Sequence, residues 1–436
     1  MAEGAIWNPE RETMPRRELE QLQLERLQAT NSRVYRNVQF YRHSFDAHDI
    51  APEDFETLDD LQKLPFTTKD DLRRAYPYDM FALPLREVVR IHASSGTTGQ
   101  ATVVGYTKND LEDWTELVAR TLFAAGITKD DVVQVFFGYG LFSGGFGFHQ
   151  GAERIGASVL PVSSADIESQ VRVMHDFRTT ALVGIPSYAR EIAQAMDDMG
   201  LTPGSLCLRL GVFGGEPWSE EARAELEQRM SIRATDNYGL SEMGGPGVSG
   251  ECRERCGLHI AEDHFIAEVI NPETGERLPP GEEGELVFTS VCKEAFPVLR
   301  YRTGDIASLT LEPCRCGRTL ARMSRVQRRT DDMVIIHGRN IHPDDIVAVV
   351  AQVRGVGPAF RLTADRAEGG DTLGLEVELS SVLSGDTISA IELLERDIAE
   401  RLYRVFGFDI PVKIAEPRSL TAGGMRAAQV VDRRKL

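Results

Sequence analysis

LRLGVFGGEPWSEEARAELEQRM, residues 208–230, joins a short apolar run to a polar helical pattern through a pair of glycines. The apolar run is typical of a buried strand, and the glycines that follow it are typical of a tight turn. Ser219 stands where a helix N-cap belongs, and Glu220 and Glu221 favour the positive end of the helix that follows. The stretch therefore predicts a strand, a turn and a helix in succession.

The same alternation recurs along the first two thirds of the chain. Apolar runs stand at residues 132–140 (VVQVFFGYG) and 181–185 (ALVGI), and a helical pattern stands at 110–126 (DLEDWTELVARTLFAAG). Strands that alternate with helices predict an α/β fold of layered, largely parallel sheets. From residue 257 to 310 the pattern becomes more β-like, with Gly- and Pro-rich turns such as NPETGERLPPGEEG.

A second change of pattern falls near residue 329. The stretch RTDDMVIIHGRNIHPDDIV begins polar and continues as a strand, a glycine turn and a helix start. The rest of the chain holds β-like runs and one long amphipathic helical pattern, which suffice for a small α+β domain. We therefore expect two domains, residues 1–329 and residues 330–436, joined by a tight hinge because no low-complexity linker separates them.

Composition and charge narrow the range of partners. The chain has 436 residues and a net charge of −18, which argues against nucleic acid and anionic membranes because both need a positive surface. It has no run of about 18 apolar residues and no basic-then-apolar start, so we expect a cytoplasmic protein without a membrane span. Six cysteines in a chain of this length do not indicate a disulfide framework.

Residues 94–100 read SSGTTGQ and directly follow an apolar run. A loop of glycines and small hydroxyl residues brings backbone N–H groups close to an anion, most often a phosphate. Taken alone, such a loop is also typical of a surface turn. Three further stretches favour the nucleotide interpretation: DNYGLSEMGGPG at 236–247, YRTGD at 301–305 and RTDDM at 329–333.

These four motifs, in this order and at these separations, resemble the phenylacetate–CoA ligase family of adenylate-forming acyl-CoA synthetases. The likeness extends over essentially the whole chain, through GYGLFSGG, GLHIAEDHF, EGELVFTS and GRTLARM. It implies a large N-terminal adenylation domain, a small mobile C-terminal lid domain, and ATP, Mg²⁺ and CoA as cofactors. It also implies two steps: a carboxylate attacks the α-phosphate of ATP to give acyl-AMP, and the CoA thiol then displaces AMP. The family often forms dimers.

The resemblance assigns roles to residues of each motif. The glycine-rich loop would bind the β- and γ-phosphates, and Glu242 would hold Mg²⁺. Tyr238 would stack on adenine, and Asp305 would bind the ribose hydroxyls. Arg329 would reach the ribose or a phosphate, and Asp331 would be the hinge between the domains. The implied catalytic residues are Thr98, Glu242 and Arg426. The implied nucleotide-binding residues are Ser94, Ser95, Gly96, Thr97, Thr98, Gly99, Gly214, Gly215, Glu216, Pro217, Asp236, Asn237, Tyr238, Gly239, Ser241, Asp305 and Arg329.

Two lysines of the family pattern are absent. Gln100 follows the phosphate loop where a lysine is usual, and Arg426 falls where the family has its catalytic lysine. That lysine bridges the carboxylate and the α-phosphate, and removal of one such donor typically costs about 2.7–4 kcal/mol. Arginine keeps the charge but is planar and longer. Three interpretations stay open: Arg426 supports a slower adenylation, Lys435 reaches in, or adenylation is lost and only acyl transfer remains.

A second constellation consists of CRERCGLH at 252–259 and CRCG at 314–317. These segments offer five soft ligands, and a structural zinc site needs four in a tetrahedral array. Such clustering predicts zinc rather than a disulfide, with a set of free cysteines as the alternative. The resemblance favours four ligands and leaves Cys256 as the alternate. The expected zinc ligands are Cys252, His259, Cys314 and Cys316.

The resemblance places the acyl pocket within FFGYGLFSGGFGFHQGAERIG, residues 136–156. Its aromatic side chains would enclose a flat ring and its glycines would give room, although ordinary core packing is the alternative for each of them. An aromatic monoacid is the expected substrate. The residues expected to line the pocket are Tyr139, Gly140, Phe142, Phe146 and Phe148.

Three functions remain compatible with these motifs. The expected one is an ATP-dependent aryl-CoA ligase, which the phosphate loop, Glu242 and Asp305 favour. The second is an acyltransferase that passes acyl groups between AMP or CoA and a carrier-protein thiol or an amine. The third is a nucleotide-binding regulator without catalysis, which Gln100 and Arg426 would suit.

Overall fold

The structure is a computed structural model that describes most of the chain in two compact units, one ending at Thr330 and one beginning at Met333. Each unit has a hydrophobic core of its own. None of the described helices is both long and apolar enough to cross a membrane. The described residues are 6–93, 101–141, 143–163, 166–202, 204–326, 328–330, 333–336, 339–367, 370–380, 387–416, 419–420 and 428–434.

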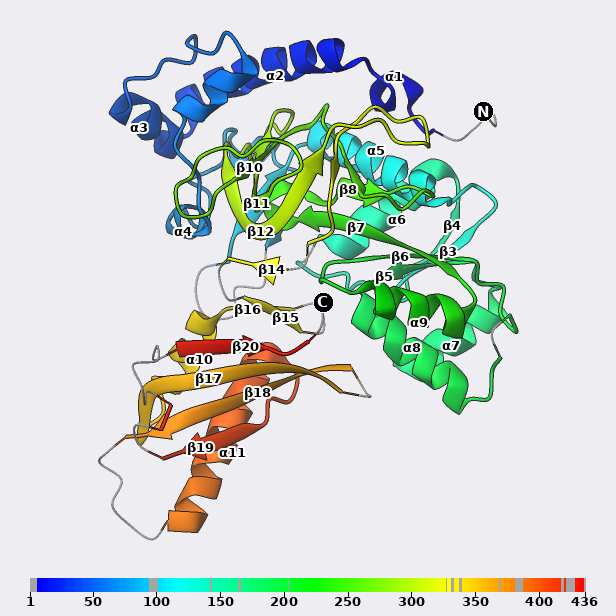
Figure 1. Cartoon of the computed structure of the whole chain (residues 1–436), viewed down its shortest axis with the longest axis vertical. Coiled ribbons are helices and arrows are strands. Elements are labelled where there is room, and N and C mark those ends of the chain that lie inside the picture. Colours follow the sequence, from blue (N-terminus) through cyan, green and yellow to red (C-terminus); the bar gives the residue numbers. More distant parts are fainter. Residues whose placement is uncertain are drawn as a thin grey trace. The chain divides into compact units, whose positions relative to one another are not determined.

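A 12-stranded sheet forms the centre of the first unit (Figure 1). Its strands lie in the order β10-β11-β12-β13-β9-β8-β7-β6-β5-β3-β4, and β14 pairs with β12. A separate hairpin of β1 (Arg90–Ala93) and β2 (Val103–Tyr106) precedes it. The strands of the sheet are β3 (Val132–Val135), β4 (Ser158–Leu160), β5 (Ala181–Gly184), β6 (Leu210–Gly214), β7 (Arg233–Leu240), β8 (Gly245–Glu251), β9 (Leu258–Ile260), β10 (Phe265–Ile270), β11 (Glu283–Ser290), β12 (Tyr301–Thr310), β13 (Arg322–Met323) and β14 (Arg328–Arg329).

The sheet is mixed rather than largely parallel. The pairs among β4, β3, β5, β6 and β7 are parallel, and the pairs from β7–β8 to β10–β11 are antiparallel. A parallel pair needs a long crossover, and helices supply it only up to β7. The later strands follow one another without an intervening α-helix, so the expectation of parallel pairing fails in the β-like segment.

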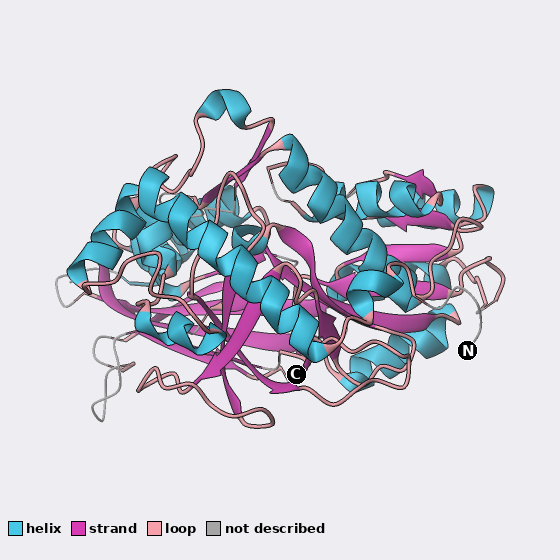
Figure 2. Cartoon of the chain, turned by 90° about the horizontal axis from the view of Figure 1, so that it is seen from above, coloured by secondary structure: helices cyan, strands magenta, loops and turns pink. Residues whose placement is uncertain are grey.

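Helices cover both faces of the parallel strands (Figure 1, Figure 2). Val183 of β5 packs in one hydrophobic cluster with side chains of α5 and α6, whereas Leu182 belongs to a second cluster with side chains of α7, α8 and α9. Successive side chains of a strand point to opposite faces, which explains this division. Ser219 caps α9 as predicted, because its Oγ accepts a hydrogen bond from Ala222 N at 3.2 Å. The helices are α5 (Lys108–Ala125), α6 (Gly144–Ile155), α7 (Ile167–Asp176), α8 (Pro186–Asp198) and α9 (Glu220–Met230).

The N-terminal residues form one long helix and several short helical elements that precede the sheet. Leu19, Leu27 and Val34 on the long helix α2 are fully buried, so that helix packs through one apolar face. Thr68 caps α4 through a capping box with Asp71. These elements are α1 (Pro9–Glu12), α2 (Arg16–Asn37), α3 (Gln39–Ala47), η1 (Leu58–Lys63), α4 (Lys69–Arg74) and η2 (Leu85–Glu87).

The second unit has the expected α+β composition. A four-stranded sheet in the order β19-β18-β17-β20 is antiparallel between β17 and β18 and parallel at its two outer pairs. Phe360, Leu375 and Leu402 are among the buried side chains of its core. Its elements are β15 (Val334–Ile336), β16 (Arg339–Ile341), α10 (Pro343–Val350), β17 (Val356–Ala367), β18 (Gly370–Leu379), α11 (Thr387–Phe406), β19 (Val412–Ala415) and β20 (Ala428–Asp432).

A buried ion pair connects α9 to the end of β8. Arg223 donates to both carboxylate oxygens of Glu251 at 2.8 and 3.0 Å, and both residues are almost completely buried. Glu251 also accepts a hydrogen bond from the backbone N–H of Asp236 at 2.8 Å. The pair therefore fixes β7, β8 and α9 relative to one another.

Removal of one partner leaves the other charge buried and uncompensated. We expect Arg223→Met to lower the free energy of unfolding by about 3–5 kcal/mol, measured by chemical denaturation. The double variant Arg223→Met with Glu251→Leu should recover most of this loss, since no charge then remains buried. A single variant as stable as the native protein would show that Glu251 needs no partner.

Candidate active site

Two neighbouring strand ends bring together the first group of predicted residues. β6 and β7 are parallel, and Gly214 pairs with Asn237 at the end of β6. The carboxyl ends of parallel strands meet at one edge of a sheet, which is the usual ligand edge of α/β folds. A Cβ atom on Gly214 would lie 2.1 Å from Asn237 O, and Gly215 has φ +84°, so this turn requires both glycines.

Tyr238, Asp305 and Arg329 meet although they come from β7, β12 and β14. Tyr238 Oη donates to Asp305 Oδ2 at 2.7 Å, and the Arg329 guanidinium pairs with the other carboxylate oxygen. Arg329 also donates to Thr303 O at 2.8 Å, and it lies opposite Asp305 in the β12–β14 pair. Burial, and then the Asp305 carboxylate, raise the pKa of Tyr238 well above its usual value. Its hydroxyl therefore stays protonated and donates to Asp305.

Glu242 lies in the single turn η3 (Ser241–Met243) between β7 and β8. Its side chain is buried, and Oε1 accepts a hydrogen bond from Tyr301 Oη at 3.3 Å. Tyr301 begins the YRTGD segment, and the sequence interpretation used only the aspartate of that segment. The structure shows that the first residue of the motif contacts the predicted magnesium ligand.

Asp236 and Asn237 use their side chains to hold the strand ends together. Asn237 Nδ2 donates to Phe213 O at 2.7 Å, and Arg325 Nε donates to Asp236 Oδ2 at 2.9 Å. Burial raises the pKa of Asp236 to about 6, although Arg325 opposes this shift. Arg325, whose guanidinium also lies 4.8 Å from the Trp218 ring, was not identified from the sequence, because only the fold brings it to Asp236.

The remaining predicted residues of the turns after β6 and β7 form backbone and side-chain contacts close to these strand ends. The Glu216 carboxylate accepts a hydrogen bond from Ser187 N at 2.6 Å, and Pro217 follows it in the turn after β6. A Cβ atom on Gly239 would lie 2.1 Å from Gly245 O, so β7 and β8 touch there. Ser241 is buried at the start of η3.

The predicted acyl region forms an aromatic cluster around the start of α6. Tyr139 packs edge-on against Phe146 with ring centres 5.3 Å apart, and its hydroxyl lies 3.2 Å from His149 Nδ1. Phe148 is 1% exposed and stacks on Phe137 at 5.4 Å, as a core side chain does. Gly140 adjoins Tyr139, and a Cβ atom there would meet nothing within 4 Å.

Arg90 adds a charge to this cluster that the sequence interpretation missed. Its guanidinium lies 5.3 Å from the centre of the Phe146 ring and donates to Gln150 Oε1 at 3.0 Å. Arg90 belongs to β1 and not to the 136–156 segment, so no local pattern could place it there. Arg90 is the first residue of β1, the strand that directly precedes residues 94–100.

Several predicted residues lie outside the described part of the chain. They are Ser94, Ser95, Gly96, Thr97, Thr98 and Gly99 of the phosphate loop, together with Gln100, Phe142, Asp331, Arg426 and Lys435.

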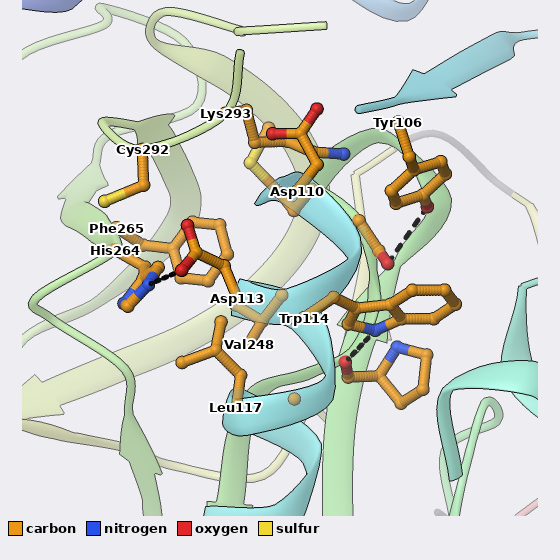
Figure 3. Close-up of a pocket in the computed structure, with 14 residues that line it drawn as sticks. Tyr106, Asp110, Asp113, Trp114, Leu117, Val248, His264, Phe265, Cys292 and Lys293 are labelled. Carbon is orange, nitrogen blue, oxygen red and sulfur yellow. Dashed lines mark hydrogen bonds and ion pairs between the residues drawn. The ribbon is translucent and has the colours of Figure 1, made fainter. Parts of the chain in front are cut away.

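A small, partly open pocket with a cavity volume of about 30 Å³ lies beside the turn that follows Glu242 (Figure 3). It is lined by α5, by the segment from Met243 to Val248, and by Cys292 and Lys293. Tyr106 Oη donates to Gly244 O at 3.0 Å, and Trp114 Nε1 donates to Pro246 O at 2.8 Å. The two aromatic side chains therefore hold two carbonyls, those of Gly244 and Pro246, in the glycine-rich turn that follows Glu242.

The four expected metal ligands gather at one point. One ligand atom from each of Cys252, His259, Cys314 and Cys316 lies within 4.8 Å of all the others. The Cys252 and Cys314 sulfurs are 3.8 Å apart, which is about the edge of a tetrahedron with Zn–S bonds of about 2.3 Å. Cys256 Sγ lies 3.4 Å from Cys314 Sγ, at the margin of the cluster.

Comparisons with known proteins show the family of the chain. The model of the AMP-binding enzyme family matches residues 20–292, and that of the AMP-binding enzyme C-terminal domain matches residues 338–434. A phenylacetate-coenzyme A ligase of Thermus thermophilus is 44% identical over 99% of this chain and 100% of that protein. One of Escherichia coli is 43% identical over 96% of each chain.

A solved structure has the same fold over the whole chain. It is a 2-hydroxyisobutyryl-CoA ligase in complex with 2-HIB-AMP and CoA, and it matches with a TM-score of 0.92 at 28% identity. The match covers 100% of this chain and 94% of that chain. The chain therefore belongs to the phenylacetate–CoA ligase family of AMP-binding enzymes, and it is an acid–thiol ligase that forms an acyl-AMP with ATP and a thioester with CoA.

Proposed function

We propose that the acid which this ligase joins to CoA is an aromatic monocarboxylic acid. The observation that carries the proposal is the cluster of Tyr139 and Phe146 at the start of α6, whose rings pack edge-on and are partly exposed. A flat ring binds well against such edges. The curated relatives that match over nearly the full chain are phenylacetate-coenzyme A ligases, which supports the same class of acid.

In this proposal the nucleotide binds at the carboxyl edge of β6 and β7. Asp305 accepts hydrogen bonds from the ribose hydroxyls, and Arg329 and Tyr238 hold its carboxylate in place. The ring of Tyr238 supports adenine beside the turn of Gly214, Gly215, Glu216 and Pro217. Asp236, Asn237, Gly239 and Ser241 shape the floor through the contacts described above.

The reacting groups come from both units. Glu242 holds Mg²⁺, which neutralises charge on the phosphates, and the loop Ser94–Gly99, including Thr98, binds the β- and γ-phosphates. Arg426 faces the α-phosphate as the carboxylate attacks it. The domain of residues 330–436 then turns about Asp331 against the domain of residues 1–329, so that CoA reaches the acyl-AMP.

The cysteine–histidine cluster has a structural role in this proposal. Cys252, His259, Cys314 and Cys316 bind one zinc ion, which ties the end of β8 to the loop before β13. The His259 Nε2 atom lies 3.5 Å from Cys316 Sγ, and the sulfur spacing suits a tetrahedron. A closed site of four protein ligands leaves no position for substrate.

Arg426 separates the ligase from a second candidate. If arginine cannot replace lysine, adenylation fails and the chain transfers acyl groups between AMP or CoA and a carrier thiol. We expect the native protein to form aryl-CoA from ATP, CoA and phenylacetate or a substituted benzoate. We also expect Arg426→Lys to raise the rate of ATP–pyrophosphate exchange by about tenfold or more, up to the roughly 10²–10³-fold effect of one such donor.

The measurement is thioester formation and pyrophosphate exchange over a panel of acids, with the native protein and Arg426→Lys compared side by side. Thioester formed by the native protein identifies the ring. No exchange until lysine is restored, together with acyl transfer from supplied acyl-CoA to a thiol without ATP, would favour the acyltransferase.

Asp305 tests the nucleotide site. Asp305→Asn removes the charged acceptor while keeping the side-chain size, and hydrogen bonds to charged groups contribute about 1.5–3 kcal/mol. We expect the KM for ATP to rise by about tenfold to a hundredfold, and the thermal stabilisation by AMP to disappear. The exposed Asp409→Asn is the matched control and should behave as the native protein does. Equal ATP affinity in both variants would remove Asp305 from the site.

Metal analysis tests the zinc site without reference to activity. We expect about one zinc per chain after dialysis, and Cys314→Ser should lose the metal and lower the Tm of the first unit. Cys256→Ser should keep the metal, since Cys256 stands at the margin of the cluster. The exposed Cys207→Ser is the control. A metal-free native protein, or equal loss of zinc from Cys256→Ser, would contradict the four-ligand assignment.

A further inference from the structure

Lys293 is a buried lysine that forms no ion pair within the described part of the chain. Its side chain is 8% exposed, and Nζ has no hydrogen-bond partner among the described residues. The ammonium lies 4.1 Å from the centre of the Tyr106 ring, at the pocket beside the turn that follows Glu242 (Figure 3). A charge over a desolvated aromatic face gains about 2 kcal/mol, which is less than the usual cost of burying an unpaired ion. Lys293 therefore does not stabilise the fold.

The carboxylates around the pocket are already engaged. Asp110 accepts backbone hydrogen bonds from Thr107, Glu294 and Ala295 at 2.9, 2.7 and 3.1 Å. These bonds use both of its oxygens and hold the segment that carries Lys293. Asp110 thus fixes the lysine without forming an ion pair with it.

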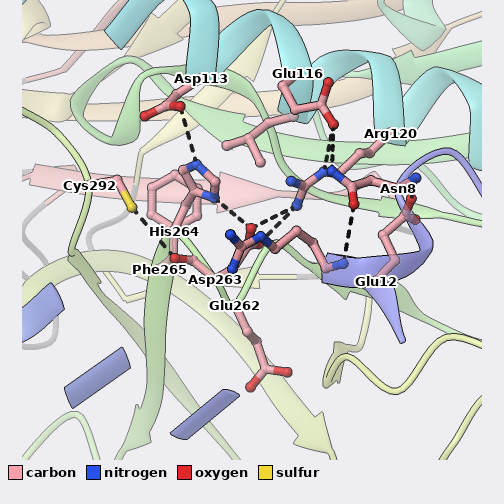
Figure 4. A network of polar contacts seen from close by, with 12 residues as sticks. Asn8, Glu12, Asp113, Glu116, Arg120, Glu262, Asp263, His264, Phe265 and Cys292 are labelled. Atoms are coloured by element: carbon pink, nitrogen blue, oxygen red, sulfur yellow. Dashed lines mark hydrogen bonds and ion pairs between the residues drawn. The ribbon is translucent and has the colours of Figure 1, made fainter. Parts of the chain in front are cut away.

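The opposite wall of the pocket is neutralised by its own network (Figure 4). His264 Nδ1 lies 3.1 Å from Asp263 and its Nε2 lies 3.8 Å from Asp113, while Arg120 donates to both oxygens of Asp263 at 2.9 and 3.0 Å. Burial lowers the pKa of His264, but hydrogen bonds to Asp113 and Asp263 raise it more, so the net shift is upward and favours the protonated form beside two carboxylates. The Lys293 ammonium therefore interacts mainly with the Tyr106 ring and with the turn at Gly244.

The turn in question is the glycine-rich segment that follows Glu242. A Cβ atom on Gly244 would lie 3.3 Å from Lys293 Nζ, so the ammonium contacts the turn. Gly244 and Gly245 have φ of +111° and +101°. Glycine adopts this backbone conformation readily but also adopts others, so contacts from other residues must fix the turn. The hydrogen bond from Tyr106 to Gly244 O, with Lys293 over the same ring, holds the turn in place.

We propose that Lys293 is a positioning residue for adenylation, whose ammonium, held over Tyr106, fixes the turn after Glu242 and thereby the carboxylate of Glu242. This inference rests on the proposed role of Glu242 in the reaction. Lys293 touches neither substrate nor nucleotide in this role. It keeps the turn from drifting, and a displacement of about 1 Å at a reacting group can lower a rate about a hundredfold.

Activity and stability should then respond to pH in opposite directions. Burial lowers the pKa of Lys293 to about 8, against a weaker opposing effect of Asp110. The charged form is lost as the pH rises through about 8, so adenylation should decline there. The unfolded lysine keeps its proton up to about pH 10.4, so the native state binds fewer protons between these values and its stability should rise with pH. The titratable or charged groups around Lys293 are Asp110, Asp113, Tyr106, His92, His264, Cys292 and Glu242.

The decisive comparison is Lys293→Met against Lys108→Met, an exposed lysine at the start of α5, the helix that also lines the pocket. ATP–pyrophosphate exchange and Tm are measured from pH 6.5 to 9.5 with phenylacetate and related acids. We expect Lys293→Met to lower kcat about tenfold to a hundredfold at pH 7, to lose the decline above pH 8, and to have an unchanged or higher Tm. Lys108→Met should match the native protein.

Tyr106→Phe provides a second variant that keeps the aromatic ring. It removes the hydrogen bond to Gly244 O, so kcat should fall, but the decline above pH 8 should remain because Lys293 is intact. Native activity with an unchanged rate and pH profile in Lys293→Met would overturn the inference alone. A lower Tm in Lys293→Met with normal kcat would assign the lysine to stability and also overturn it. No exchange by the native protein with any acid would overturn the proposed function and this inference together.

Discussion

Backbone contact between β6, β7 and β8 is the constraint on which the site depends. No Cβ atom fits at Gly214, which meets Asn237 O, or at Gly239, which meets Gly245 O. With the three strands in contact, Tyr238 and Glu242 on either side of Gly239 reach the same strand, β12, where each side chain bonds to one end of the YRTGD segment. A side chain at either glycine would separate the strands. Tyr238 and Glu242 would then no longer both contact β12.

Buried arginine–carboxylate pairs hold the first unit together over long sequence separations. Arg120 pairs with Asp263, and Arg300 pairs with Glu268 through bonds of 3.0 and 3.1 Å. Such pairs contribute little net stability, since desolvation offsets most of their attraction, but a mispaired chain would leave the charges alone and is strongly disfavoured. The pairs therefore contribute more to the specificity of the fold than to its free energy of unfolding. Lys293 differs from them because its charge faces a ring.

Local pattern was enough to predict the elements that depend on neighbouring residues. The strand, turn and helix at residues 208–230 and the cap at Ser219 follow from side-chain type and spacing alone. The four motifs predicted the family because each is short and their order is characteristic, and the comparisons confirm it. The antiparallel half of the sheet was not predicted, because apolar content does not specify the direction in which a strand pairs.

Contacts between segments far apart in the sequence were not predicted either, because a local pattern does not show which segments meet in the fold. Arg325 and Asp236 are 89 residues apart, and Arg90 meets Gln150 from 60 residues away. Neither arginine stands in a motif, so only the folded structure shows which side chain it contacts. The cysteine cluster was the exception: ligand chemistry limits which residues suit a metal, and the four expected ones do lie together.

The end of β8 joins two parts of the molecule that have been described separately. Glu251 anchors Arg223 and the backbone of Asp236, and the next residue along the chain is Cys252 of the cluster. Nothing flexible separates them, since consecutive Cα atoms are about 3.8 Å apart. A metal that orders Cys252 also orders the strand end against which a nucleotide would bind. If both proposed sites are filled, the two affinities are thermodynamically linked and the linkage is reciprocal: nucleotide would raise the affinity for metal by the same factor as metal raises the affinity for nucleotide.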